Sequence, residues 1–149
     1  MKASELMTKD PAVVHPDDTV REAASRMERN DCGCLPVVEN GNSGRLVGVV
    51  TDRDIATRAV GHGRGPDTQV SEIMSADPHC CRSEDDVATV QQIMAEEQVR
   101  RVPVVDQDGR PVGMIAQADL ARAAEYRVEV SDSDLAHVVE RVSAPKTTE

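Results

Sequence analysis

The residues best suited to chemistry lie between Gly48 and Asp54, a stretch that reads Gly-Val-Val-Thr-Asp-Arg-Asp. Two apolar residues typical of a buried strand precede a short polar turn, which carries the hydroxyl of Thr51 and the carboxylate of Asp54. The turn leads into a segment of helical pattern, and the first N–H groups of a helix have no partner within it. A hydroxyl, a carboxylate and free N–H groups could together hold one small polar ligand.

A degenerate copy of this stretch recurs between Gly113 and Asp119 as Gly-Met-Ile-Ala-Gln-Ala-Asp. The copy keeps its aspartate, but Ala116 stands where the first copy has a hydroxyl. A second interpretation of the complete copy stays open. Thr51 and Asp54 could act only as caps, because either residue stabilises a helix start with no ligand present.

The two stretches belong to a longer internal repeat. Residues 7–11 (Met-Thr-Lys-Asp-Pro) match residues 74–78 (Met-Ser-Ala-Asp-Pro), an offset of 67 (74 minus 7). The offset becomes 65 at Gly48 (113 minus 48), so the first copy has two extra residues in a polar loop near residues 40–44. Surface loops tolerate such insertions. The chain is therefore a tandem duplication.

Each copy predicts the element order β-α-β-β-α. In the first copy we expect an extended stretch, a helix capped by residues 17–19, two strands joined by a Gly/Asn-rich loop, and a helix stopped by Gly61. The expected bounds are 12–15, 20–27, 35–38, 46–50 and 52–60 in the first copy, then 86–97, 102–105, 112–115 and 118–126 in the second.

The repeat implies an α/β (α+β) protein with four parts: repeat 1 (1–60), a Gly-rich linker (61–69), repeat 2 (70–126) and a C-terminal helix and tail (127–149). In the last part, residues 131–134 look like a cap for a helix to about Val142, with four apolar residues expected to face inward. These are Leu135, Val138, Val139 and Val142. Residues 143–149 are expected to fray. A unit of about 55 residues is marginal alone, so the two repeats are expected to pack together.

The composition and charge of the chain exclude several classes of function. The formal charge is −10 and the pI is near 4.8, which disfavours binding to nucleic acid or to anionic membranes. No apolar run approaches the length of a membrane span or a signal-peptide core, so a cytoplasmic protein is expected. The sequence also has no nucleophile elbow, no metal-binding helix motif and no phosphate-cradling glycine loop, so no enzyme activity is expected.

Four cysteines form two close pairs, Cys32 with Cys34 and Cys80 with Cys81. In a reducing cytosol they are expected to be thiols. A redox or soft-metal site, with His79 adjacent, is the competing interpretation, although neither pair has the two-residue gap of a zinc knuckle.

Two β-α-β-β-α copies, each with an apolar-Pro-Val-Val strand and a Gly-apolar-apolar-x-x-x-Asp turn, resemble paired CBS (cystathionine-β-synthase-type) domains, which form a Bateman module. The resemblance covers about residues 5–125. It implies a pseudo-twofold disc whose inter-repeat cleft often binds an adenosine-containing molecule, and discs that often pair into homodimers.

By this resemblance, Asp54 would accept from ribose hydroxyls and Thr51 would donate to ribose or phosphate. Residues of the other repeat would complete the cleft: Val99 with the basic pair Arg100 and Arg101 for phosphate, and Ser75 and His79 near the base. A guanidinium fork suits phosphate. The competing interpretation is that Arg100 and Arg101 are solvated surface residues paired with the nearby Glu96 and Glu97.

A second, weaker cleft would contain Asp119, Gly33 and Thr8. It lacks the hydroxyl at Ala116 and has Cys-Gly-Cys instead of a basic pair. We therefore expect one competent nucleotide cleft per chain.

The resemblance favours a stand-alone regulatory protein that binds AMP, ADP, ATP or S-adenosylmethionine, needs no cofactor, and signals to an unknown protein in trans. Two alternatives remain open. One is a ligand-free dimeric interaction protein, for example in a stress response, and the other is a sensor built on Cys32, Cys34, Cys80 and Cys81.

Overall fold

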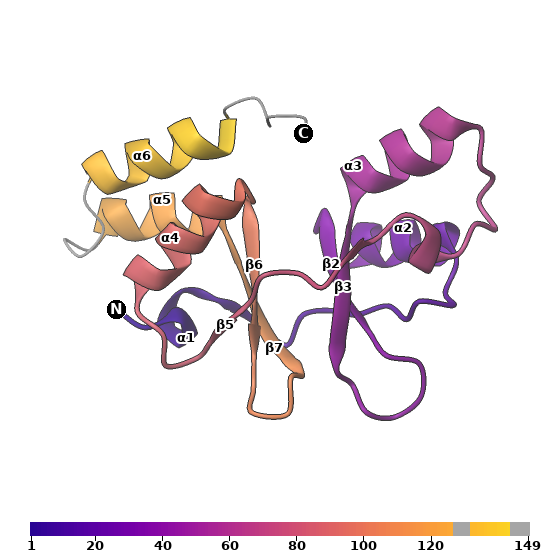
Figure 1. Cartoon of the computed structure of the whole chain (residues 1–149), viewed down its shortest axis with the longest axis horizontal. Coiled ribbons are helices and arrows are strands. Elements are labelled where there is room, and N and C mark those ends of the chain that lie inside the picture. Colours follow the sequence, from indigo (N-terminus) through magenta and orange to yellow (C-terminus); the bar gives the residue numbers. More distant parts are fainter. Residues whose placement is uncertain (127–131, 144–149) are drawn as a thin grey trace. The chain divides into compact units, whose positions relative to one another are not determined.

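The computed structural model describes residues 1–126 and 132–143. The chain forms two compact units of mixed helices and strands. One, here called unit 1, contains residues 1–9, 79–106, 112–126 and 132–143. The other, unit 2, contains residues 10–78 and 107–111. The α+β class expected from the sequence is confirmed, and Figure 1 shows both units.

Unit 2 carries most of the first repeat. Its sheet has the order β2-β3-β4, and both neighbouring pairs are antiparallel. The predicted helix and hairpin are confirmed within one or two residues. The elements are α2 (Val20–Arg29), β2 (Cys34–Val38), β3 (Leu46–Thr51), α3 (Asp52–Asp54), η1 (Ile55–Ala59), η2 (Val60–His62), η3 (Val70–Glu72) and β4 (Ser75–Ala76).

Helix α2 begins directly after Thr19, one of the residues predicted to cap it. The Thr19 hydroxyl accepts a hydrogen bond from the Glu22 N–H at 3.2 Å, which pairs one of the free donors of the first turn. Val20, Ala23 and Met27 are buried on one face. The helix therefore lies on the sheet by its apolar stripe.

The sequence predicted that the second helix of this repeat stops at Gly61, and this prediction is wrong. The helix runs from α3 through a π-helical turn (η1) and a 3₁₀ turn (η2) to His62. Gly63 ends it, because its φ of +73° lies in the left-handed region that favours glycine. The Arg64 N–H then donates to the Ala59 carbonyl at 2.9 Å. The sequence alone does not show which of the three closely spaced glycines ends the helix.

Unit 1 carries most of the second repeat. Its sheet has the order β1-β7-β6-β5, with β1 antiparallel to β7 and β5 parallel to β6. The short helix α1 was not predicted from the sequence. The elements are α1 (Ala3–Leu6), β1 (Thr8–Lys9), β5 (Cys81–Arg82), α4 (Val87–Glu97), β6 (Arg101–Val105), β7 (Pro111–Ala116), α5 (Gln117–Tyr126) and α6 (Asp132–Ser143).

The compact units do not coincide with the sequence repeats 1–60 and 70–126. Residues 1–9 are the first part of repeat 1 in the chain but pack in unit 1, where Thr8 and Lys9 pair with Met114 and Gly113 of β7. Ser75 and Ala76 likewise pair with Val49 and Gly48 of β3 in unit 2. A sheet edge accepts any strand that satisfies its hydrogen bonds, so the strand that leads into each repeat completes a sheet of the other.

The methionine that directly precedes each of these strands packs against a glycine. In unit 2 a Cβ on Gly48 would lie 2.7 Å from Met74 Sδ and 3.0 Å from the Ser75 carbonyl oxygen. In unit 1 a Cβ on Gly113 would clash with Met7 Sδ and would lie 2.9 Å from Met7 Cβ. The glycine that opens each copy of the repeated turn pattern is thus required by packing.

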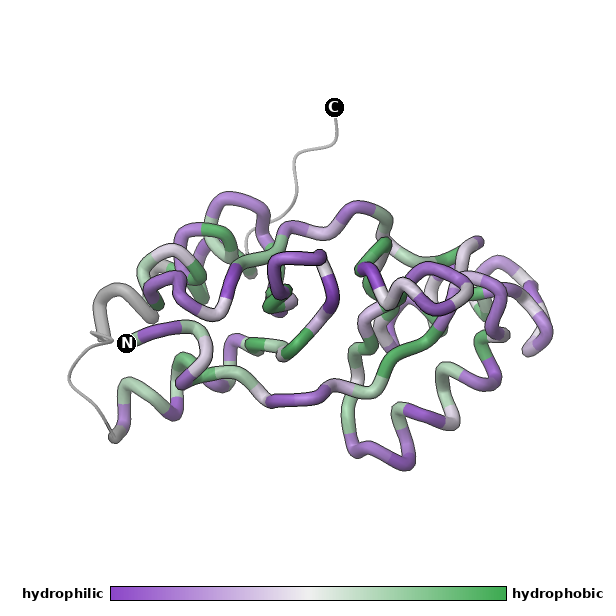
Figure 2. Tube along the Cα trace, turned by 90° about the horizontal axis from the view of Figure 1, so that it is seen from below, coloured by the Kyte–Doolittle hydropathy of each residue, from purple (hydrophilic) through white to green (hydrophobic). Residues whose placement is uncertain are grey.

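Each unit has its own aliphatic core. Leu35, Val37 and Val50 are fully buried in unit 2, as are Val102, Val104 and Ile115 in unit 1. Figure 2 colours the trace by hydropathy and shows hydrophobic segments alternating with hydrophilic ones. No helix among residues 1–126 and 132–143 is long and apolar enough to cross a membrane.

The predicted C-terminal helix exists as α6, which packs on α4 and α5. Val138 and Val142 join the core of unit 1, as expected. Val139 does not face inward as expected, because its exposed fraction is 43%. The predicted cap at Ser131, the Leu135 side chain and the predicted tail beyond Ser143 lie outside the described residues.

Candidate functional site

The turn between β3 and α3 is closed by reciprocal hydrogen bonds. The Asp54 N–H donates to Thr51 Oγ1 at 3.1 Å, and the Thr51 N–H donates to Asp54 Oδ2 at 3.0 Å. This is a capping box, so the capping role considered for both residues is present. Asp54 has a second oxygen, Oδ1, which lies 3.7 Å from Arg58 Nε. The side chain is 15% exposed, so the turn holds a fixed carboxylate near the surface.

The equivalent turn of unit 1 keeps only half of this arrangement. The Ala116 N–H donates to Asp119 Oδ2 at 2.7 Å, while Asp119 Oδ1 pairs with Arg122. Ala116 has no hydroxyl to accept a bond in return. Asp119 is 8% exposed and is the one buried charged residue in the described part of the chain.

Within each unit, a carbonyl that immediately precedes a strand is bonded to the capping turn. The Asp52 N–H donates to the Gly33 carbonyl at 2.9 Å, and the Gln117 N–H donates to the Arg100 carbonyl at 2.8 Å. Gly33 therefore lies beside the turn of Thr51 in unit 2. Arg100 lies beside the turn of Ala116 in unit 1.

The residues predicted for the first cleft are divided between the units. Thr51, Asp54 and Ser75 belong to unit 2, whereas His79 and residues 99–101 belong to unit 1. Those predicted for the second cleft are divided in the same way, with Gly33 in unit 2 and both Asp119 and Thr8 in unit 1. That either set meets in one cleft stays a prediction.

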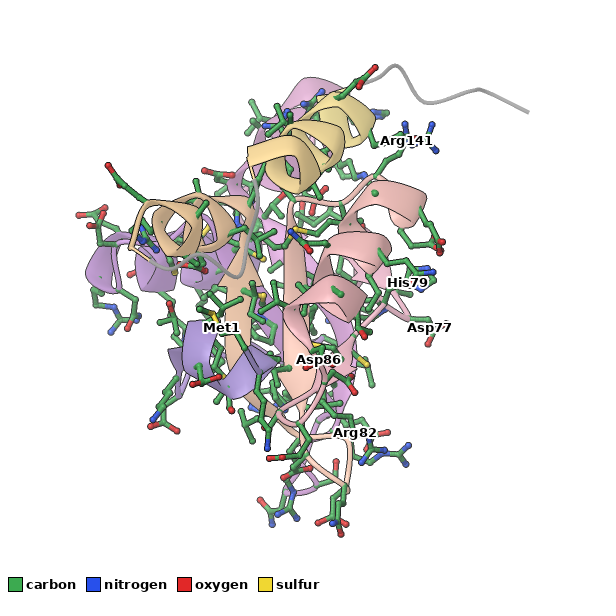
Figure 3. All side chains as sticks on the ribbon, turned by 90° about the vertical axis from the view of Figure 1, so that its left-hand side faces the viewer. Met1, Asp77, His79, Arg82, Asp86 and Arg141 are labelled. Atoms are coloured by element: carbon green, nitrogen blue, oxygen red, sulfur yellow. The ribbon has the colours of Figure 1, made fainter. Side chains whose placement is uncertain are left out.

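Arg100 and Arg101 differ in exposure and in their surroundings from what an ion pair with the neighbouring glutamates would require. Arg100 is exposed and Arg101 is partly buried. No salt bridge joins either of them to an acid among the described residues. Glu97 instead lies 3.0 Å from His79 Nε2, where His79 projects beside α4 (Figure 3). Glu96 accepts from Gln92. The pairing with Glu96 and Glu97 that was the competing interpretation is therefore not formed.

The four cysteines are free thiols of two kinds. Cys32 and Cys80 are exposed, and Cys34 and Cys81 are buried. Burial, followed by the nearby charges of Asp85 and Cys80, raises the pKa of the Cys81 thiol to about 12. No group of three or more His, Cys, Asp or Glu in the described part of the chain is arranged to hold a metal ion.

These environments predict unequal thiol reactivity, because the thiolate is the reactive species. In the folded protein at neutral pH, a chromogenic disulfide reagent should label Cys32 and Cys80 quickly. Cys34 and Cys81 should react only after denaturation. Cys81→Ser should leave the fast phase unchanged, whereas Cys80→Ser should halve it. A fast phase of four thiols would contradict the burial.

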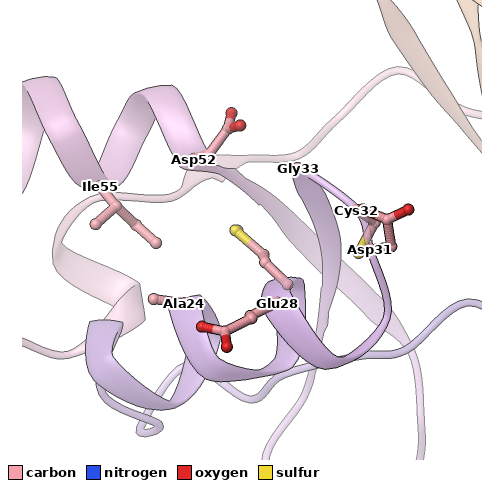
Figure 4. Close-up of a pocket in the computed structure, with 8 residues that line it drawn as sticks. Ala24, Glu28, Asp31, Cys32, Gly33, Asp52 and Ile55 are labelled. Atoms are coloured by element: carbon pink, nitrogen blue, oxygen red, sulfur yellow. The ribbon is translucent and has the colours of Figure 1, made fainter.

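A pocket that the sequence did not reveal lies in unit 2 between α2 and α3 (Figure 4). Its volume is about 520 Å³, and its walls include Glu28, Asp31 and Asp52 together with Ala24 and Ile55. The polar residues on the outer side of α2 can be recognised in the sequence. That α3 lies against this helix and closes a pocket with it can be seen only in the fold.

Comparison with known proteins supplies the family. The chain matches the CBS domain twice, over residues 3–61 and 70–126. The CBS domain-containing protein YhcV of Bacillus subtilis is 43% identical over 117 residues, which cover 78% of this chain and 81% of YhcV.

Two solved structures share the fold closely. The CBS domain protein PAE2072 from Pyrobaculum aerophilum, complexed with AMP, is 26% identical with a TM-score of 0.76, and the match covers 94% of this chain and 99% of that one. Hypoxic Response Protein I with two coordinated zinc ions is 32% identical with a TM-score of 0.72, over 82% and 98% of the two chains. Two matched domains and these similarities show that the chain belongs to the CBS-domain family as a tandem pair.

Proposed function

We propose that this protein is a regulatory module that binds an adenosine-containing molecule between its two CBS domains and signals its occupancy to a protein partner. The observation that carries the proposal is the Asp54 carboxylate, which its capping box holds in one orientation at the surface of unit 2. A carboxylate fixed in this way suits a vicinal diol, because each of its oxygens can accept from one hydroxyl. The relative PAE2072 was solved with AMP.

Each predicted residue has a distinct task in this proposal. Asp54 accepts from the ribose hydroxyls, of which one replaces the long contact of Oδ1 with Arg58. Thr51 Oγ1 has a lone pair and a proton left after it accepts from the Asp54 N–H. Arg100 and Arg101 supply cationic donors for a phosphate. Val99, Ser75 and His79 border the base.

Isothermal titration calorimetry of the whole chain with AMP, ADP, ATP and S-adenosylmethionine tests the proposal. We expect one site per chain. Asp54→Ala should weaken binding about tenfold or more, since a charged hydrogen bond is worth about 1.5–3 kcal/mol. Arg100→Ala and Arg101→Ala should weaken the phosphate-bearing ligands more than S-adenosylmethionine. The absence of heat with all four ligands would contradict the proposal.

The matched variant Asp119→Ala separates two arrangements of the cleft. If the arginines serve the turn of Thr51, as we propose, Asp119→Ala leaves the affinity within about twofold of wild type, the scatter of independent sites. Loss of binding in Asp119→Ala, with Asp54→Ala unaffected, would show that the arginines serve the turn of Ala116 beside them. Melting curves of both variants control for folding, because both residues cap helices.

The same proposal includes a cytoplasmic homodimer without enzymatic activity, whose output acts on a separate protein. A ligand can signal only if it prefers one arrangement of the domains or of the dimer. Small-angle scattering with and without the ligand would detect such a preference. An unchanged scattering curve at saturation would contradict signalling by rearrangement.

One comparison favours zinc binding as a second candidate. The relative Hypoxic Response Protein I was solved with two coordinated zinc ions, and this chain exposes Cys32 and Cys80. Zinc would be held as thiolate complexes. Metal analysis of protein purified without chelators, compared with a Cys32→Ser and Cys80→Ser double variant, tests this candidate. Equal zinc content in both would exclude these thiols as ligands.

A further inference from the structure

The helices that follow the two capping turns carry an arginine at different positions. At the offset of 65, Thr57 corresponds to Arg122 (57 plus 65), and Arg58 corresponds to Ala123 (58 plus 65). The arginine of the second repeat therefore follows its capping aspartate by three residues, whereas that of the first repeat follows by four. One position along a helix turns a side chain by about 100°. The two arginines therefore meet their aspartates differently.

In unit 1 the arginine takes one oxygen of the capping carboxylate. Arg122 Nη2 donates a hydrogen bond to Asp119 Oδ1, and the Ala116 N–H donates to the other oxygen, Oδ2, at 2.7 Å. The Asp119 side chain is 9% exposed, and a carboxylate buried to this degree needs a cationic partner. A ribose diol that approached this turn would find Oδ1 already covered by a guanidinium.

In unit 2 the arginine leaves the corresponding oxygen without a hydrogen bond from its side chain. Arg58 Nε lies 3.7 Å from Asp54 Oδ1, which is longer than a hydrogen bond. Arg58 Nη1 donates instead to the Ile73 carbonyl at 3.2 Å. Arg58 lies in the π-helical turn η1, whereas α5 is a regular α-helix. Single π-helical turns are frequent at functional sites.

Thr57 occupies the position at which the second repeat has its arginine. Its hydroxyl donates to the Arg53 carbonyl of the preceding turn at 2.7 Å, a bond that holds a short side chain against its own helix. Thr57 also carries no charge that could compensate a carboxylate. The first repeat therefore has no cation at the position from which Arg122 covers Asp119.

We infer that Arg122 closes the turn of Ala116 to a ribose, and that the position of this arginine confines ribose binding to Asp54. This inference rests on the proposed function and names the residue that selects between its two turns. The missing hydroxyl at Ala116 is then only part of the reason. Arg122 gives Asp119 a permanent partner, whereas Asp54 exchanges its long contact with Arg58 for a ligand.

Transfer of the arginine to the first repeat tests the inference by calorimetry with AMP. The double variant Thr57→Arg, Arg58→Ala copies the Arg-Ala of residues 122–123. It should weaken AMP binding about tenfold or more, because the ribose must then displace a charge-assisted hydrogen bond. The matched control Ala56→Arg adds an arginine only two residues after Asp54, where the two side chains do not face each other. It should leave the affinity within about twofold.

The reverse change should open the second turn. Adenosine, which has the diol but no phosphate, is the probe, because this turn faces no predicted basic pair. The variant Ala116→Thr, Arg122→Thr should bind one adenosine more per chain than Ala116→Thr alone. Melting curves control for folding. The transfer to the first repeat changes only exposed residues, so it decides the question even if the reverse variant melts too low for titration.

The outcomes separate this inference from the proposed function. Unchanged AMP affinity in the Thr57→Arg, Arg58→Ala variant would overturn the role of the arginine and leave the proposed function intact. Equal adenosine stoichiometry in Ala116→Thr with and without Arg122→Thr, in folded protein, would do the same. A wild-type chain that binds neither AMP nor adenosine, nor any of the other three ligands, would overturn both.

Discussion

Gly113→Ala is expected to destabilise the protein by about 2–3 kcal/mol, toward the upper end of the cost of overpacking a tight core. The new methyl group would overlap Met7 Sδ and would lie 2.7 Å from Met7 Cγ and 2.9 Å from Met7 Cβ. Rotation of the thioether alone cannot relieve a contact with Cβ, so β1 must shift from β7. Urea denaturation followed by circular dichroism measures the loss.

Two further variants make this prediction specific. Gly65→Ala is the control, because no atom lies within 4 Å of the added methyl group and its φ is not positive; its effect should stay within about 0.5 kcal/mol. Met7→Ala combined with Gly113→Ala should cost less than the sum of the single changes, because the methionine that clashes is gone. Strict additivity would show that the methionine is not the cause.

Leu120→Ala is expected to cost about 2–5 kcal/mol of unfolding free energy, the range for a buried leucine. Leu120 is fully buried in the core of unit 1. It follows Asp119 directly, so its packing also fixes the helix whose first turn that carboxylate caps. Urea denaturation measures the effect.

The repeat supplies the matched residue for this change. Ile55 occupies the equivalent position at the offset of 65, but it is only partly buried and lines the pocket between α2 and α3. Ile55→Ala should therefore cost clearly less than Leu120→Ala, measured at a concentration where both proteins are monomeric. Equal costs would contradict the difference in burial between the two side chains.

Most of the helices and strands could be predicted from the sequence, because the local residue pattern and the position within the repeat indicated the same element. Thr19 began α2, and the apolar-Pro-Val-Val run at residues 35–38 became β2, as predicted. The capping turn was also predictable, since Thr51 and Asp54 have the spacing of a capping box. Its role toward a ligand is a proposal that no local pattern can decide.

Other features depended on long-range contacts and were not predictable. The helix that begins at Asp52 ends at Gly63 rather than Gly61, because Gly63 is the glycine whose φ angle lies in the left-handed region. Composition could not show that Val139 would remain exposed while Val138 is buried. The pocket between α2 and α3 is formed by two helices that meet only in the folded unit.

The exchange of the leading strands has a consequence during synthesis. Residues 1–9 leave the ribosome well before their partners, which lie in β7, at residues 113 and 114, and near Ser83 and Asp85. The N-terminal strand must therefore wait unpaired while more than a hundred residues are translated, and unit 2 also lacks residues 107–111 until late. Since such long-range closure is slow, the nascent chain exposes Met7 to chaperones and proteases until the last strand emerges. A fragment of residues 1–60 would lack the partner strand β4, and a fragment of residues 70–126 would lack the partner strand β1.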